Sequence, residues 1–400
     1  MPEIAKVPAI RFKNFTDAWE QRKLKDLFKV TRGNVLAATI TSEKKTEDAP
    51  YPVYSSQTKQ NGLMGYYKEF LYEDAITWTT DGANAGTVNY RAGKFYCTNV
   101  CGVLLSNEIK ANQMIAEALN NIAKKYVSYV GNPKLMNNVM ADIEIKLPSQ
   151  EKERDTISSF FYDLDNLITL HQRKLLKLKN VKKAMLEKMF PKNGSNVPEI
   201  RFAGFTDAWE QRKLGNIVER IVRKNTNNES TLPLTISALY GLVDQITYFN
   251  NRVASRDVSN YYLVMNGEFA YNKSTSDGFP FGAVKRLDLY ENGVLSTLYI
   301  VFSIRDCEET NSDFLAVFFG TDRWHKGVSE RAAEGARNHG LLNISADDFL
   351  DIGLFIPRET DEQKQIGTYF KNLDNLITLH QRKYEKLQNL KKACLEKMFV

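Results

Sequence analysis

Two internal repeats constrain this chain more than any other feature, because repeated segments decide the architecture into which a chain can fold. Residues 7–24 return with few changes as 197–214, an offset of 190. Residues 164–174 return as 373–383, an offset of 209. The chain therefore contains two copies of one plan.

The repeats bracket two inserts, residues 25–146 and 215–355, that differ in length and look unrelated in sequence. A repeated frame around dissimilar inserts is typical of two different recognition elements held in one geometry. The alternative is a plain gene duplication whose middle parts have drifted.

Composition limits the class of protein. The 400 residues are 43% hydrophobic and 26% charged, which fits a soluble globular protein of two or three domains. No apolar run approaches the ~18 residues that cross a bilayer, and residues 1–12 lack a secretory pattern, so we expect a cytoplasmic protein without a membrane partner. The net charge of +6 is compatible with a polyanionic partner. The four scattered cysteines favour reduced thiols, with zinc or disulfide use as the minor alternative.

Residues 151–190 are predicted to form one long helix. Pro148 precedes it, acidic residues fill its first turn, and Pro191 and Gly194 mark its end. An apolar stripe in steps of three and four predicts a coiled-coil seam, and the second copy repeats the same spacing. The predicted seam residues are Ile157, Phe161, Leu164, Ile168, His171, Leu175 and Leu178, and then Ile366, Phe370, Leu373, Ile377, His380, Tyr384 and Leu387.

The charges of these helices favour an antiparallel pair. The stretch 151–165 holds five acidic and two basic residues, whereas 171–190 holds one acidic and seven basic residues, and the second helix is polarised in the same way. Antiparallel pairing places each basic half beside an acidic half. His171 and His380 occupy equivalent seam positions; a metal site or pH switch is conceivable, but a packing role is favoured and no metal site is predicted.

Both inserts follow one coarse order, which predicts an α+β domain used twice. Each has early strands (75–79; 268–272), glycine-rich loops (81–86; 274–282), further apolar strands (100–105; 294–302), a helix (114–127; 314–319) and a last strand (143–147; 352–356) that leads into the long helix.

The loops carry aromatic, amide, hydroxyl and basic side chains, which suit DNA bases and phosphates. For any single residue a solvated surface loop is the alternative. The candidates in the first insert are Tyr54, Ser55, Ser56, Gln57, Lys59, Asn61, Asp81, Asn84, Lys134 and Asn137. Those in the second are Lys273, Ser274, Thr275, Lys285, Arg286, Arg331, Arg337, Asn338 and His339.

Catalytic motifs are missing from the sequence. Residues 272–275 resemble the end of a phosphate-binding loop but lack its glycines, and there is no dinucleotide or S-adenosylmethionine glycine motif, no Asn/Asp-Pro-Pro-Tyr/Phe tetrapeptide, no helicase motif and no cluster with metal-ligand spacing. We therefore expect no catalytic residues and no bound cofactor.

The repeated blocks resemble a known family. Val-Pro-x-Ile-Arg-Phe with Phe-Thr-Asp-Ala-Trp-Glu-Gln-Arg-Lys-Leu, at 7–24 and 197–214, is similar to the start of each half of type I restriction–modification specificity subunits. Residues 147–190 and 356–399 resemble their helical regions, and 51–65, 74–96 and 335–344 resemble parts of their target-recognition domains. The resemblance covers essentially the whole chain.

The resemblance implies a non-catalytic subunit that recognises double-stranded DNA. Each target-recognition domain would read half of a bipartite target, and the helices would set the gap between the halves. Two methyltransferase subunits would methylate adenine, and motor–nuclease subunits would join for cleavage; S-adenosylmethionine, ATP and magnesium would belong to those partners.

The predicted division is a first target-recognition domain (1–148), a helix (149–192), a second domain (193–357) and a second helix (358–400), with pseudo-two-fold symmetry. Two alternatives remain: a coiled-coil adaptor that holds two protein-binding domains, and a self-sufficient nuclease or methyltransferase.

Overall fold

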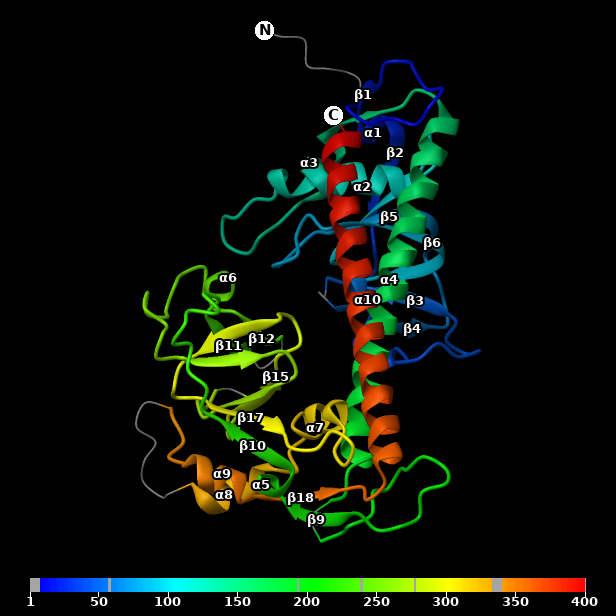
Figure 1. Cartoon of the computed structure of the whole chain (residues 1–400). Helices are drawn as coiled ribbons and strands as arrows, with labels where there is room; N and C mark the ends of the chain where they lie inside the picture. Colours follow the sequence, from blue (N-terminus) through cyan, green and yellow to red (C-terminus); the bar gives the residue numbers. More distant parts are fainter. Residues whose placement is uncertain are drawn as a thin grey trace. The chain divides into compact units, whose positions relative to one another are not determined.

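The computed structural model describes residues 8–56, 59–192, 194–237, 240–276, 278–332 and 340–399. The chain forms two compact units (Figure 1). The first unit contains the described residues up to Arg173 together with those from Gln381 onward, and the second contains those of Lys174–His380. Each long helix contributes to both units. The predicted division is of another kind, because it treats the helices as spacers separate from the two domains, and it stays a prediction.

The first unit is built on a six-stranded sheet in the order β2-β7-β5-β6-β3-β4 and a separate antiparallel pair, β1-β8. Neighbouring strands of the sheet are antiparallel except β3 and β6. Apolar residues of α2 and of the central strands share one buried core. The strands are β1 (Glu20–Lys23), β2 (Phe28–Arg32), β3 (Tyr51–Tyr54), β4 (Leu63–Tyr67), β5 (Tyr72–Thr79), β6 (Val88–Cys97), β7 (Cys101–Ser106) and β8 (Glu144–Leu147). The short helices are α1 (Leu24–Leu27), α2 (Gln113–Ile122) and α3 (Asn137–Asp142), with 3-10 turns η1 (Ala38–Ile40), η2 (Lys59–Gly62) and η3 (Ala123–Tyr126).

The second unit contains a four-stranded sheet in the order β10-β17-β14-β15 and three strand pairs, β9-β18, β11-β12 and β13-β16. Its strands are β9 (Glu210–Lys213), β10 (Val218–Ile221), β11 (Leu234–Ser237), β12 (Gly241–Asp244), β13 (Tyr262–Met265), β14 (Phe269–Asn272), β15 (Ala283–Arg286), β16 (Asn292–Leu295), β17 (Ile300–Ile304) and β18 (Gly353–Ile356). Its short helices are α5 (Leu214–Ile217), α6 (Gln245–Phe249), α7 (Ser312–Phe318), α8 (His325–Arg331) and α9 (Ala346–Leu350).

The two inserts share a central sheet despite their dissimilar sequences. The order β2-β7-β5-β6 in the first unit corresponds to β10-β17-β14-β15 in the second, and in each unit the first strand pairs with the strand that precedes a long helix. The inserts differ in what is added: the hairpin β3-β4 in the first, and β11-β12 with β13-β16 in the second.

A buried ion pair anchors each repeated start segment to its long helix. Arg11 donates to Glu153 through Nε at 2.6 Å and Nη2 at 2.7 Å. Arg201 donates to Glu362 at the same two distances. Both glutamate side chains are 1% exposed. Because a bidentate arginine–carboxylate pair fixes orientation as well as distance, the two units hold their start segments in one geometry.

The long helices are α4 (Glu151–Lys188) and α10 (Thr360–Met398), and both begin with acidic residues in the first turn. Every predicted seam residue is buried or half-buried, whereas Leu390, which continues the same spacing three residues after Leu387, is 46% exposed. None of the helices that the structure describes has an apolar stretch of the length and hydropathy that crossing a bilayer requires.

The contacts within each unit show that the helices run in opposite directions. In the first unit, Phe161 of α4 stacks on Phe399, just after α10, with ring centroids 5.7 Å apart, and Lys391 of α10 donates to Asp165 of α4 at 2.7 Å. In the second unit, Phe190, just after α4, lies 6.3 Å from the ring of Phe370 in α10, and Lys182 of α4 donates to Asp374 of α10 at 2.6 Å. Coiled-coil pairing along the whole length stays a prediction.

One strand prediction was wrong. Residues 294–302 were expected to form a single strand, but β16 and β17 are separated by a turn in which Tyr299 N donates to Ser296 O at 3.1 Å. The two strands pair with different partners, β13 for β16 and β10 with β14 for β17. An apolar run conceals such a turn because both flanking strands are buried.

Candidate nucleic-acid interface

In the first unit, hydrogen bonds draw several predicted residues into one cluster at the end of β3. Ser55 N donates to Gly62 O at 2.8 Å and so closes the turn between β3 and β4. Thr98 Oγ1 donates to Ser55 Oγ at 3.0 Å, and Asn84 Nδ2 donates to Ser56 O at 2.9 Å. Three loops that are distant in sequence therefore meet at the end of β3.

Arg91, which was not among the residues predicted from the sequence, contacts two residues of this cluster from a buried position. Its guanidinium carbon lies 3.7 Å from the centroid of the Tyr54 ring, and Nη2 donates to Asn61 O at 2.7 Å. Arg91 is 8% exposed, and its hydrogen-bond partners, which include Thr77, are neutral. Burial lowers the pKa of Arg91, against the opposing effect of Tyr54. Asn61 itself is exposed and left-handed (φ 53°), so Arg91 holds a strained turn in place.

A second strip of the first unit joins the loop after β5 to the loop before α3. Lys134 Nζ lies 3.9 Å from the Asp81 carboxylate, and Gly82 N donates to Pro133 O at 2.9 Å. Tyr129 and Val130 are 70% and 92% exposed in the same loop. Asn137 lies apart from this strip, because its Nδ2 donates to Thr31 O at 3.2 Å.

In the second unit, Lys273, Ser274 and Thr275 continue from β14 and pair with the segment 340–344. Thr275 N donates to Gly340 O at 2.7 Å, Leu342 N donates to Lys273 O at 3.0 Å, and Lys273 Nζ donates to Ile344 O at 3.3 Å. Ser274 is exposed, whereas the other two are half-buried. The side chain of Lys59 and the candidates Gln57, Arg337, Asn338 and His339 lie outside the described residues.

The arginines of the second insert are held by carboxylates. Arg286 donates to Asp313 at 2.7 Å and to Asp288 at 2.6 Å. Arg331 donates to the Asp351 carboxylate at 3.0 Å. The carboxylates compensate the positive charge of both guanidinium groups and occupy several of their hydrogen-bond donors, so both arginines are less suited to binding a phosphate.

Lys285 is half-buried on β15. Among the described residues, no hydrogen bond joins it to the segment Lys273–Thr275. Burial lowers the pKa of Lys285, and the nearby Lys182 ammonium lowers it further while Asp374 opposes both effects.

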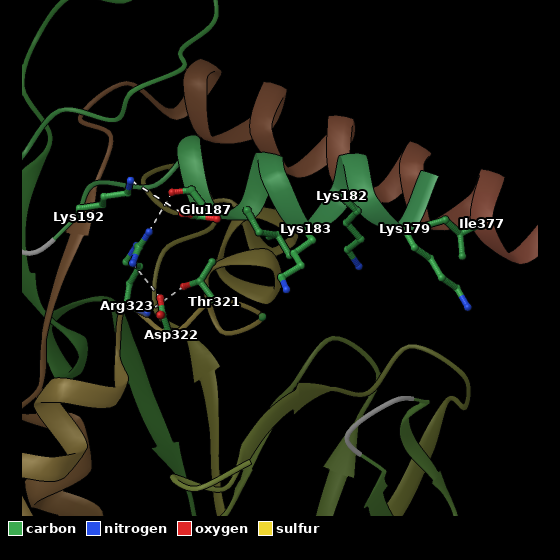
Figure 2. Close-up of a pocket in the computed structure, with 11 residues that line it drawn as sticks. Lys179, Lys182, Lys183, Glu187, Lys192, Thr321, Asp322, Arg323 and Ile377 are labelled. Carbon is green, nitrogen blue, oxygen red and sulfur yellow. Dashed lines mark hydrogen bonds and ion pairs between the residues drawn. The ribbon is translucent and has the colours of Figure 1, made fainter. Parts of the chain in front are cut away.

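Two basic features escaped the sequence analysis. One is Lys124-Lys125-Tyr126 with Tyr129, an exposed mixture of basic and aromatic residues whose spacing could have revealed it. The other is a groove beside the last turns of α4, lined by Lys179, Lys182, Lys183 and Arg323 among others (Figure 2). The groove could not be predicted from the sequence, because Arg323 comes from the loop after α7 and is far from the α4 lysines along the chain.

The arrangement offers hydrogen-bond donors, acceptors and cations on exposed loops. No group of three or more His, Cys, Asp or Glu side chains in the described part of the chain is placed to hold a metal ion. What the loops present is the chemistry of recognition: amide and hydroxyl groups for base edges and ammonium groups for phosphates.

Comparison with known proteins connects this fold to one family. A family model described as "Type I restriction modification DNA specificity domain" matches residues 16–180. A Mycoplasma pneumoniae protein named as the N-terminus of a type I specificity subunit is 40% identical over 144 residues, which are 34% of this chain and 75% of that protein. For a second M. pneumoniae relative, at 34% identity, the match covers 36% of this chain and 48% of the relative.

More distant matches extend over the whole chain. The specificity subunit of the type I restriction enzyme MjaVIII from Methanocaldococcus jannaschii is 22% identical over 400 residues, 94% of this chain and 91% of its own length. The crystal structure of a type I restriction–modification S subunit from M. genitalium has the same fold, with a TM-score of 0.67 at 14% identity over 98% of this chain and 99% of that one. This chain belongs to the family of type I restriction–modification specificity subunits.

Proposed function

We propose that the chain reads a bipartite DNA sequence for a type I restriction–modification complex, with one half-site read by each insert. The observation that carries the proposal is the combination of two identical anchors with two different inserts. Arg11–Glu153 and Arg201–Glu362 have the same geometry, whereas the loops that they hold differ in sequence, length and added strands. An asymmetric target in two parts requires two different recognition domains that are held in the same way, and the two inserts with their matching ion pairs fit that requirement.

In the first reader, the proposed contacts are the exposed and half-exposed groups of the clustered loops: Ser55, Ser56, Asn61, Asn84 and Lys134. Asparagine and serine can bond base edges, and lysine neutralises phosphate. In the second reader, Lys273, Ser274 and Thr275 are the corresponding candidates. Arg286 and Arg331 are proposed to shape that surface rather than contact DNA, because carboxylates already occupy them.

Two copies of a methyltransferase subunit are the proposed partners of the long helices. Leu167 and Leu170 of α4 are each 45% exposed, and the equivalent Leu376 and Leu379 of α10 are 44% and 46% exposed. Two equal apolar surfaces at positions related by the repeat fit two copies of one partner. Adenine methylation, and cleavage by motor–nuclease subunits, are proposed activities of those partners and not of this chain.

Exchange of one insert tests the proposal. Residues 25–146 are replaced with the corresponding insert of another family member, and methylated sites are mapped in cells that also contain the methyltransferase. We expect one half of the recognised sequence to change and the other half and the gap to stay. A change in both halves would contradict independent readers.

The control exchanges residues 215–355 instead. This exchange should change only the opposite half of the target. If both exchanges altered the same half, the assignment of one reader to each insert would be wrong.

A further inference from the structure

The groove beside the last turns of α4 is strongly basic. It lies wholly in the second unit, between α4 and the loop that follows α7, and has a volume of about 530 Å³. Five basic and two acidic side chains line it, a net charge of +3: Lys179, Lys182, Lys183, Lys192, Arg323, Glu187 and Asp322. Figure 2 shows the three α4 lysines leaving the same side of the helix.

Two of these cations lack a counter-ion. Lys182 is paired with Asp374 at 2.6 Å, and Arg323 donates to Asp322 at 2.9 Å. Within the part of the chain that the structure describes, the side chains of Lys179 and Lys183 make neither an ion pair nor a hydrogen bond, and both residues are exposed. They lie one helical turn apart, about 6 Å along the axis.

The groove also contains an unsatisfied donor. Nε of Arg323 is buried and has no hydrogen-bond partner, although Nη2 of the same side chain donates to Glu187 O at 2.9 Å. Because this nitrogen is buried, it cannot contact a ligand in the groove, and the Arg323 guanidinium contributes to the site through its positive charge.

The repeat supplies an internal comparison, because the frame around α4 and α10 is nearly identical. At the positions equivalent to Lys179, Lys182 and Lys183, α10 has Gln388, Lys391 and Lys392, and Lys392 is exposed as Lys183 is. Gln388 donates to the Tyr384 hydroxyl at 2.8 Å, and Lys391 is held by two carboxylates. The charge of Lys183 is therefore common to both copies, whereas the frame does not require the free charge of Lys179, which points to a ligand specific to the second unit.

We propose that this groove binds the sugar–phosphate backbone of duplex DNA, and that sequence-independent affinity is therefore concentrated on the side of the second reader. The inference rests on the proposed DNA-reading function and adds a site to it. Lysines on flexible stems neutralise phosphates as point charges and release counterions, so they add affinity without reading sequence. The carboxylates that occupy Arg286 and Arg331 weaken the insert's own phosphate contacts, and the groove compensates for that weakness.

The test measures binding of the full chain to a random-sequence duplex over a range of salt concentrations. The variant carries Lys179→Gln and Lys183→Gln. The matched control carries Lys174→Gln and Lys177→Gln, which remove the same charge from exposed positions of the same helix outside the groove. Circular dichroism confirms that both variants fold.

We expect the groove variant to lower the slope of log affinity against log salt by about 2, because each phosphate contact contributes about 0.9. The control should lower it by less than half as much, and discrimination between target and random duplexes should stay unchanged. Equal slopes for the two variants, with the wild-type chain binding DNA, would overturn the groove alone. A wild-type chain without salt-dependent DNA binding would overturn the proposed function as well.

An acidic protein segment is the competing occupant. If the groove variant matched the control on DNA but bound poly-glutamate more weakly, the groove would fit an acidic polypeptide and the proposal would be wrong.

Discussion

Two lysines related by the repeat should differ in their contribution to stability. Lys391 donates to Glu117 at 2.7 Å and to Asp165 at 2.7 Å in the first unit. Its equivalent, Lys182, donates to Asp374 at 2.6 Å in the second. Replacing each lysine with methionine keeps most of the packing of the stem and removes the charge.

Burial sets the expected difference. The side chains of Lys391 and Glu117 are 22% and 7% exposed, whereas those of Lys182 and Asp374 are 31% and 51% exposed. Removing one partner of a fully buried pair costs about 3–5 kcal/mol, and partial exposure at Lys391 reduces this to about 2–3 kcal/mol. A surface pair contributes about 0–1 kcal/mol. We therefore expect Lys391→Met to destabilise its unit by about 2 kcal/mol more than Lys182→Met destabilises the other.

Hydrogen exchange measured by mass spectrometry reads each unit separately, because peptides from α2 report on the first and peptides from α7 on the second. Glu117→Gln combined with Lys391→Met should restore part of the loss, since the double variant removes the more buried of the two carboxylates that Lys391 neutralises. Burial would lower the pKa of Lys391, but Glu117 and Asp165 raise it above its ordinary value of 10.5, so the effect should be constant from pH 6 to 9 and fade only above pH ~10.5. Equal losses for the two lysines would refute the reasoning from burial.

Three further predictions concern packing, titration and helix length. Gly102→Val should destabilise the first unit by more than about 2 kcal/mol in urea unfolding, because an added Cβ would lie 2.1 Å from the buried ring of Trp78; a smaller loss would mean that the ring can move. Burial raises the pKa of Asp313, but hydrogen bonds from two basic side chains lower it below its ordinary value of 3.8, so its stabilisation should be complete above pH ~4 and be lost as pH falls further. Asp313→Asn should abolish that part of the acid dependence, and an unchanged titration would exclude this carboxylate as its source. Seven residues inserted after both Arg173 and His380 lengthen each helix by about 10.5 Å, so the recognised gap should grow by about three base pairs at ~3.4 Å each. An unchanged gap would contradict the proposal that the long helices set the gap between the half-sites.

The placement of that insertion follows from the structure. The insertion points must lie inside the helices, because α4 ends at Lys188 and Ile200 N donates back to Lys188 O at 3.0 Å. An insertion after Lys192 would therefore enlarge a connecting loop and leave the helix unchanged. The equivalent bond from Ile10 N to Lys397 O, also 3.0 Å, closes the first unit in the same way.

The helices were predictable because their signal is local. A stripe in steps of three and four places its residues on one face of a helix, and the structure buries or half-buries the predicted seam positions. The exception is Leu390, which is exposed. The neighbouring residue, Lys391, is the one that faces the protein at this point, because it pairs with Glu117 and Asp165. That arrangement depends on α2, which is far away in sequence.

The sheet and the candidate site were less predictable because they depend on long-range pairing. The apolar run 294–302 contains two strands whose partners lie in different parts of the insert. The composition of the loops identified Ser55, Ser56 and Asn84 as candidate DNA contacts, but it did not show that Arg286 is neutralised by Asp313, 27 residues later. Arg91 was missed because its role is to support other residues from a buried position.

The measurement that tests the account most directly is a map of N6-methyladenine. The chain is expressed with its neighbouring methyltransferase subunit in a host without adenine methylation, and the genome is read by long-read sequencing. We predict one bipartite sequence with a fixed gap, methylated on both strands and absent when this chain is omitted. A folded complex of the two proteins that methylated no such sequence would contradict the account and favour a protein-binding adaptor.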